Sequence, residues 1–90
     1  MLVRQDLDKS YMSVQAGHAV AEWLLNDQSW QNKTLIYLKV EDEKELTNWA
    51  NKLEDQGIKY FLFKEPDIGN QGTALSCYTD NKIFKKLKLV

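Results

Sequence analysis

The period of the hydrophobic pattern changes several times along the chain, and each change marks a predicted element. Residues 2–7 begin with two apolar residues and predict a short strand. From about Ser10 to Asn26, apolar residues recur every three or four positions, which is the spacing of one helix face. That face consists of Met12, Ala16, Ala19, Val20, Trp23 and Leu24.

A second strand and a second helix follow. Residues 34–40 are almost continuously apolar and rich in β-branched and aromatic side chains, which predicts a strand covered on both faces. Asp42, with Glu45 three positions later, resembles a capping box at the start of a helix. Gly57 is placed to end that helix in a left-handed turn. Its buried stripe is predicted to be Leu46, Trp49, Ala50 and Leu53.

The last third of the chain predicts two strands, 58–63 and 73–79, joined by the loop 64–71. Residues 81–90 predict a short helix followed by an extended end. Helical links require crossovers between parallel strands, whereas the short loop permits an antiparallel pair. The order therefore predicts an α/β fold with a mixed sheet of about four strands.

Length and composition narrow the class of protein. We expect residues 1–90 to form a single domain, because a chain this short buries only about 60–65% of its unfolded surface. The one cysteine, Cys77, excludes a disulfide framework; it lies in an apolar strand, where core packing is expected. We find neither a signal-peptide pattern nor an apolar run of the roughly 20 residues that a bilayer requires. We therefore expect a cytoplasmic protein with no membrane partner.

The charge is nearly balanced, with 12 basic and 13 acidic residues and a net charge of −1. This balance argues against general nucleic-acid binding but leaves a local basic patch open. The lysines at 82, 85, 86 and 88 either form such a basic edge or belong to a solvated C-terminal helix.

The strongest candidate for chemistry lies on the first helix. Gln15, His18 and Glu22 are spaced i, i+3, i+7 and share one strip, with Tyr11 one turn earlier. The strip flanks the apolar face, so its side chains can line a cleft while packing holds them. The alternative is a solvated face on which His18 is incidental.

A second candidate cluster surrounds the loop between the last two predicted strands. Glu65, Asp67 and Thr73 bracket this loop, and strand-end loops often carry sites in α/β folds. Ordinary turn chemistry at Pro66 and Gly69 explains the same residues without any function. One histidine and one cysteine on distant segments make a poor zinc set, so we expect neither a metal nor a cofactor.

The residues 3–7, Val-Arg-Gln-Asp-Leu, and 14–19, Val-Gln-Ala-Gly-His-Ala, resemble the opening of the archaeal and eukaryotic type of peptidyl-tRNA hydrolase. That family has V-R-x-D-L, then a Gly-Lys pair, then A-Q-x-x-H-A. Residues 72–75 resemble its T-x-L-A strand, and residues 87–90 resemble its L-K-L ending. The resemblance implies a three-layer α/β/α sandwich around a mixed four-stranded sheet.

The resemblance also implies an activity, which is hydrolysis of the ester bond between a peptide and the 3′ end of tRNA. Its substrate would be peptidyl-tRNA or another acylated tRNA, and family members often form homodimers, for which Trp30 is a candidate contact. The site residues carried over are the catalytic candidates Gln15, His18, Asp67 and Thr73 and the substrate-binding candidates Arg4, Lys9, Tyr11 and Glu65.

Two departures from the family pattern bear on the activity. Ser10-Tyr11 replaces the Gly-Lys pair, and Lys9 is a substitute that projects in a different direction. The family's D-A-G-R-T loop is shortened to residues 65–72 and lacks an arginine. A non-catalytic relative that binds or regulates is therefore the alternative hypothesis, and a hydrolase for a small ester or amide is the third.

Overall fold

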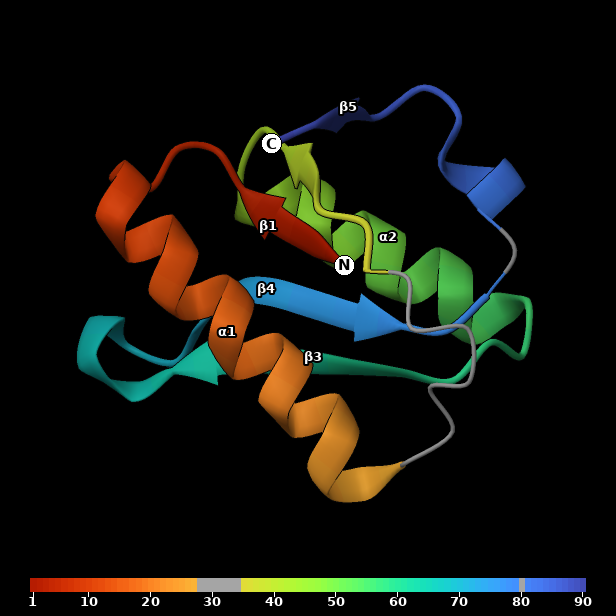
Figure 1. The fold of residues 1–90 in the computed structure, drawn as a ribbon, viewed down its shortest axis with the longest axis horizontal. Helices are drawn as coiled ribbons and strands as arrows, with labels where there is room; N and C mark the ends of the chain where they lie inside the picture. Colours follow the sequence, from red (N-terminus) through yellow and green to blue (C-terminus); the bar gives the residue numbers. More distant parts are fainter. Residues whose placement is uncertain (28–34, 80) are drawn as a thin grey trace.

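We describe the fold from a computed structural model, which describes residues 1–27, 35–79 and 81–90 (Figure 1). Two α-helices and five strands alternate with two short 3-10 helices, η1 and η2. In chain order the elements are β1 (Leu2–Arg4), α1 (Lys9–Asn26), β2 (Leu38–Val40), α2 (Glu43–Asp55), β3 (Tyr60–Glu65), η1 (Pro66–Ile68), β4 (Gln71–Cys77), η2 (Asn81–Phe84) and β5 (Lys88–Leu89).

The sheet is mixed and has the strand order β3-β4-β1-β2-β5. β1 and β2 run parallel, whereas β1/β4, β2/β5 and β3/β4 are antiparallel pairs. The predicted α/β class and mixed sheet are confirmed, but the predicted count of about four strands was one too few. The extended end supplies the fifth strand, because Leu89 pairs with Leu38 and the Val90 N–H donates to the Tyr37 carbonyl at 3.1 Å.

The predicted three-layer sandwich is confirmed, since α1 covers one face of the sheet and α2 the other (Figure 1). Strand residues alternate between two apolar cores, as in β1, where Leu2 packs toward α2 and Val3 toward α1. The α2-side core contains Leu2, Leu38, Val40, Leu46, Ala50, Leu53, Leu75 and Phe84. The α1-side core contains Met1, Val3, Ala16, Ala19 and Ala74.

The predicted caps of the second helix are confirmed. The Asp42 side chain accepts from the Glu45 N–H at 2.9 Å, and the Glu45 carboxylate accepts from the Glu41 N–H at 2.7 Å. These bonds satisfy backbone donors that the first turn of a helix leaves unpaired. Gly57 has a φ of 69°, which favours glycine over residues with a side chain. Both ends of α2 are therefore encoded locally in the sequence.

Five element predictions differ from the structure in their bounds. The strands expected over 58–63 and 73–79 are each shifted by two residues, to Tyr60–Glu65 and Gln71–Cys77. The strand expected over 34–40 begins only at Leu38, with Leu35 and Tyr37 exposed, so this segment is not covered on both faces; Thr34 lies outside the described residues. The strand expected over 2–7 ends at Arg4. The Arg4 guanidinium binds the carboxylate of Asp6, two residues later in the chain. The short helix expected after residue 81 is only the 3-10 turn η2.

The side chain of Leu53 tests the α2-side core. Leu53 is fully buried in the cluster beneath α2. We expect Leu53→Ala to lower the free energy of unfolding by about 2–5 kcal/mol, because it removes buried methyl groups and leaves a cavity. Leu25→Ala is the control, since Leu25 is 81% exposed on α1. Urea titration measures both, and equal effects of the two substitutions would contradict the assignment of the core.

Candidate functional site

A buried chain of polar side chains links α1 to the last two long strands. The Thr73 hydroxyl donates to Gln15 Oε1 at 2.5 Å, and Gln15 Nε2 donates to Glu65 Oε2 at 2.9 Å. Gln15 and Thr73 are 1% and 0% exposed, and Glu65 is also buried. Because an unpaired polar group in such a place is costly, these bonds fix all three side chains relative to one another.

Small residues on α1 bring this helix close enough to the sheet for the contact. Ala16 and Ala19 are both buried against the sheet, and the Ala19 carbonyl accepts from the Ser76 hydroxyl at 2.7 Å. Gln15 therefore faces strand residues rather than water. The sequence pattern placed Gln15 at the flank of the apolar face, and the structure shows that this flank is itself covered.

A β-bulge turns Thr73 toward α1. Phe63 pairs with Ala74 and Lys64 pairs with Gly72, so Thr73 is the extra residue in β4. Ala74 packs on the α1 side, and regular alternation would direct Thr73 to the α2 side. With the bulge, Thr73 and Ala74 both face α1, and the Thr73 hydroxyl reaches Gln15.

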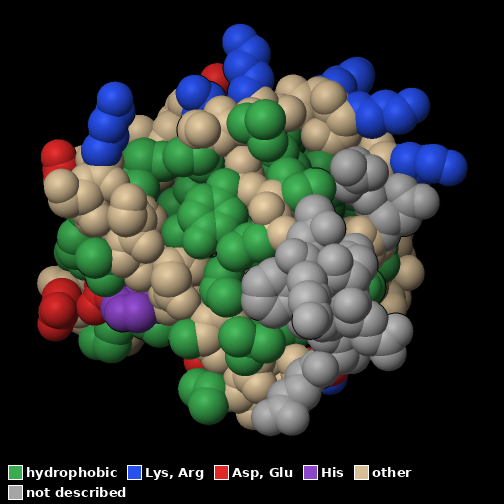
Figure 2. Space-filling view, in the orientation of Figure 1, with side chains coloured by type: hydrophobic (Ala, Val, Ile, Leu, Met, Phe, Trp, Pro, Cys, Tyr) green, Lys and Arg blue, Asp and Glu red, His purple; other side chains and the backbone are tan. Residues whose placement is uncertain are grey.

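His18 lies at the outer end of the polar chain. Its Nδ1 is 3.7 Å from Glu65 Oε2, and its ring lies 4.5 Å from the ring of Phe63, centroid to centroid. The His18 side chain is 44% exposed, unlike the three residues behind it. Figure 2 shows the histidine (purple) at the surface beside acidic side chains (red). A buried carboxylate thus faces an imidazole that solvent can reach.

Hydrogen bonding keeps the Glu65 carboxylate ionised. The pKa of Glu65 is lowered, chiefly by the Gln15 amide donor and further by the Asp67 N–H and by His18, although burial acts to raise it. The Asp67 N–H donates to Glu65 Oε1 at 3.3 Å. Desolvation raises the pKa of Tyr11, and the charges of Glu65 and Asp67 raise it further, so this phenol is neutral near pH 7. The cluster therefore offers the ionised carboxylate of Glu65, the imidazole of His18 and the neutral phenol of Tyr11.

The structure brings six of the eight predicted site residues together. These are Tyr11, Gln15, His18, Glu65, Asp67 and Thr73. The strip is not uniformly solvated, because Gln15 is buried and His18 lies beside Glu65 at the end of β3. Phe63 packs against the imidazole of His18, but sequence patterns did not single it out. The reason is that this contact joins α1 to a strand far along the chain.

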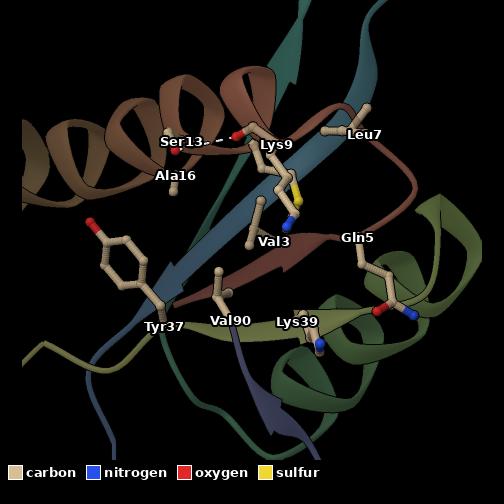
Figure 3. Close-up of a pocket in the computed structure, with 10 residues that line it drawn as sticks. Val3, Gln5, Leu7, Lys9, Ser13, Ala16, Tyr37, Lys39 and Val90 are labelled. Atoms are coloured by element: carbon tan, nitrogen blue, oxygen red, sulfur yellow. Dashed lines mark hydrogen bonds between the residues drawn. The ribbon is translucent and has the colours of Figure 1, made fainter.

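Arg4 and Lys9 lie apart from this cluster. The Arg4 guanidinium binds both Asp6 oxygens, at 2.9 and 2.7 Å, and its Nη1 donates to the Gln71 side chain and the Gly72 carbonyl. These contacts join the end of β1 to the start of β4. Lys9 lines a different pocket, on another side of α1 (Figure 3).

The remaining expectations concern metals, membranes and contacts. Among the described residues, no three or more His, Cys, Asp or Glu side chains are grouped to hold a metal ion. Cys77 packs against the α2-side core, as predicted, and burial raises the pKa of its thiol. Within the described part of the chain, neither helix has the length and apolar character to cross a membrane. Trp30, the candidate dimer contact, lies outside the described residues.

Comparison with known proteins identifies one family. A family model described as peptidyl-tRNA hydrolase PTH2 matches residues 1–90, which is the whole of the sequence. A search of curated proteins found no match.

The lowered pKa of Glu65 predicts a pH-dependent contribution to stability. Because the folded-state pKa lies below the ordinary value of 4.5, the ionised carboxylate stabilises the fold above that pH. This contribution is lost as the pH falls through the folded-state pKa. We therefore expect the difference in unfolding free energy between the wild type and Glu65→Gln to be constant near neutrality and to shrink below about pH 4.5. Urea titrations from pH 7 to 3 measure it, and a pH-independent difference would contradict the assignment.

Proposed function

The chain belongs to the peptidyl-tRNA hydrolase PTH2 family, and we propose that it hydrolyses the ester bond of peptidyl-tRNA, or of a related acylated tRNA, to release free tRNA. The observation that carries this proposal is the buried Thr73–Gln15–Glu65 chain, which ends at the half-exposed imidazole of His18. Ester hydrolysis requires a positioned water, a group that takes its proton and donors for the developing oxyanion.

His18 is proposed as the general base. Because Nδ1 lies toward the Glu65 carboxylate and the side chain is 44% exposed, Nε2 is the nitrogen proposed to bind the water molecule. The distance of 3.7 Å from Nδ1 to Glu65 Oε2 is longer than a hydrogen bond. Such contacts commonly shorten when substrate binds, which strengthens the base at the moment of reaction.

The proposed reaction has two steps. His18 Nε2 takes a proton from water as the water oxygen attacks the ester carbonyl, and the negative charge of Glu65 stabilises the imidazolium that forms. The tetrahedral intermediate then collapses, the bond from carbon to the ribose oxygen breaks, and the imidazolium returns its proton to that oxygen. The products are the carboxylic acid of the peptide, which then releases its proton to solvent, and tRNA with its hydroxyl restored.

Gln15 and Thr73 are proposed as positioning residues. Both are buried and bonded to one another, so their role is to hold Glu65 at the correct angle to His18. Asp67 contributes its backbone N–H to the same carboxylate. This interpretation explains why a nearly inaccessible amide and hydroxyl lie in the site without contacting substrate.

Tyr11 is proposed to supply the oxyanion donor. It stands where the family has a lysine, one helical turn before Gln15 and on the same strip as His18. A neutral phenol donates one hydrogen bond without the lysine's positive charge, and the raised pKa of Tyr11 keeps the proton on its oxygen. The replacement therefore retains a donor while weakening attraction for phosphate.

The activity test compares variants on a substrate that carries the ester. We expect His18→Ala to lower the hydrolysis rate of an N-blocked aminoacyl-tRNA by about 10²–10⁴-fold, as loss of a general base does. Glu22→Gln is the control, because Glu22 lies one turn further along the same strip and its carboxylate accepts from the nearby Asn26 amide at 3.4 Å, outside the His18 cluster. A wild-type rate equal to that of buffer alone would favour the non-catalytic alternative, whereas cleavage of simple esters without tRNA hydrolysis would favour the third hypothesis.

The donor role of Tyr11 has a separate test. We expect Tyr11→Phe to lower kcat by up to about 10²-fold with little change in KM, since a donor to the oxyanion acts mainly in the transition state. Tyr11→Lys restores the family's residue and is expected to recover most of that loss. Steady-state kinetics of the three proteins decide the matter; unchanged kcat in Tyr11→Phe would remove Tyr11 from the reaction.

A further inference from the structure

A pocket of about 480 Å³ lies beside the first turns of α1, away from the His18 cluster. Its lining comes from the N-terminal half of α1, from β1 and the chain after it, from the β2 region and from the end of the chain (Figure 3). The apolar part of the wall is formed by Val3, Leu7, Met12, Ala16 and Val90. The polar part is formed by Gln5, Lys9, Ser13, Tyr37 and Lys39.

The charged side chains that line this pocket are both lysines. Lys9 and Lys39 line it, and no aspartate or glutamate does. Lys39 also pairs in register with Lys88 across the β2/β5 ladder, so these two side chains share one face of the sheet. Among the described residues, none of the three lysines is in an ion pair.

This arrangement is costly for the isolated protein. Like charges directly opposite each other on neighbouring strands are destabilising, and within residues 1–27, 35–79 and 81–90 no carboxylate forms an ion pair with Lys39 or Lys88. An anion between the ammonium groups removes that repulsion. Figure 2 shows lysine and arginine side chains (blue) along the upper edge of the molecule, away from the histidine. On the face drawn, basic side chains are therefore more frequent along this edge than around the histidine.

The same pocket has an aromatic wall. Tyr37 is 37% exposed, and its ring stands across the pocket from Lys9 (Figure 3). The Tyr37 carbonyl accepts from the Val90 N–H at 3.1 Å, which holds the tyrosine backbone to the end of the chain. An exposed tyrosine ring beside unpaired lysines is the combination that binds single-stranded nucleic acid, because bases stack on the ring while phosphates meet the cations.

We infer that this pocket binds a nucleotide unit of a single-stranded RNA. The phosphates contact Lys9, Lys39 and Lys88, and the base packs against Tyr37 and the apolar wall. Three separated cations match successive phosphates of a strand better than the single carboxylate of an amphipathic acid, which would leave two of them unpaired. A volume of about 480 Å³ is within the range of small-ligand pockets.

The position of the pocket gives it a role in the proposed reaction. Lys9 and Tyr11 are two residues apart on α1 and project in different directions, so the helix start separates the pocket from the His18 cluster. A strand bound in the pocket can cross the first turns of α1 and deliver its 3′ end to His18. This role rests on the proposed function, whereas the binding of a nucleotide does not.

Binding of deacylated tRNA and of a fluorescent single-stranded trinucleotide tests the inference, since neither contains the ester. We expect Lys39→Gln and Lys88→Gln each to weaken binding at least about fivefold and to lower the slope of log K against log salt by about 0.7. Tyr37→Leu is expected to weaken binding at least about fivefold without changing that slope, because it removes stacking alone. The matched control is Lys44→Gln, an exposed lysine on α2 that is expected to bind as the wild type does.

Three results would overturn the inference. In the first, the Lys39 and Lys88 variants bind the trinucleotide as tightly as the wild type does. In the second, inorganic phosphate competes as well as a nucleotide and Tyr37→Leu has no effect on binding. In the third, octanoate displaces the trinucleotide at a lower concentration than a nucleotide does. Thermal unfolding checks that each variant folds. If the lysine variants hydrolyse the substrate with unchanged KM, the pocket has no role in substrate binding and the proposed function is unaffected. If binding depends on the lysines but no hydrolysis is detected, the pocket binds nucleotide and the proposed function is wrong.

Discussion

The arrangement of the candidate site depends on one constraint, which is that the buried Glu65 carboxylate must be surrounded by donors. A negative charge removed from water is costly unless hydrogen bonds replace its hydration. Gln15 and the Asp67 backbone supply those bonds, and His18 adds a positive or polar neighbour. The requirement couples a helix to two strands, so the site is preorganised by the same contacts that hold α1 on the sheet.

The first helix therefore serves two surfaces at once. One of its flanks carries Tyr11, Gln15 and His18, and another carries Lys9, Met12 and Ser13. Between them, Ala16 and Ala19 keep the helix axis close to the strands. The proposed hydrolytic cluster and the proposed phosphate-binding pocket lie on two flanks of one helix and so keep a fixed separation, which suits a substrate whose charged strand and reactive ester are covalently joined.

The sequence predicted most of the fold because its strongest signals are local. The apolar period of α1, the Asp42 cap and the turn at Gly57 each depend on residues a few positions apart, and all three are present. The different projection of Lys9 also followed from helix geometry. The pairing of the chain end with β2 and the exposure of Tyr37 depend on distant segments, and the hydrophobic pattern of residues 34–40 gave no sign of either. The burial of Gln15 was hidden for the same reason.

The bulge at Thr73 makes the number of residues in β4 important for the structure of the site. Deleting Thr73 would restore a regular ladder, because Gly72 and Ala74 already pair with the adjacent residues Lys64 and Phe63 and would keep their faces of the sheet. The resulting strand would pair well and remain apolar, yet α1 would have lost the hydroxyl that holds Gln15. Length variation in this strand is therefore restricted more tightly than substitution, and a relative with one residue fewer here would need a different way to hold the carboxylate.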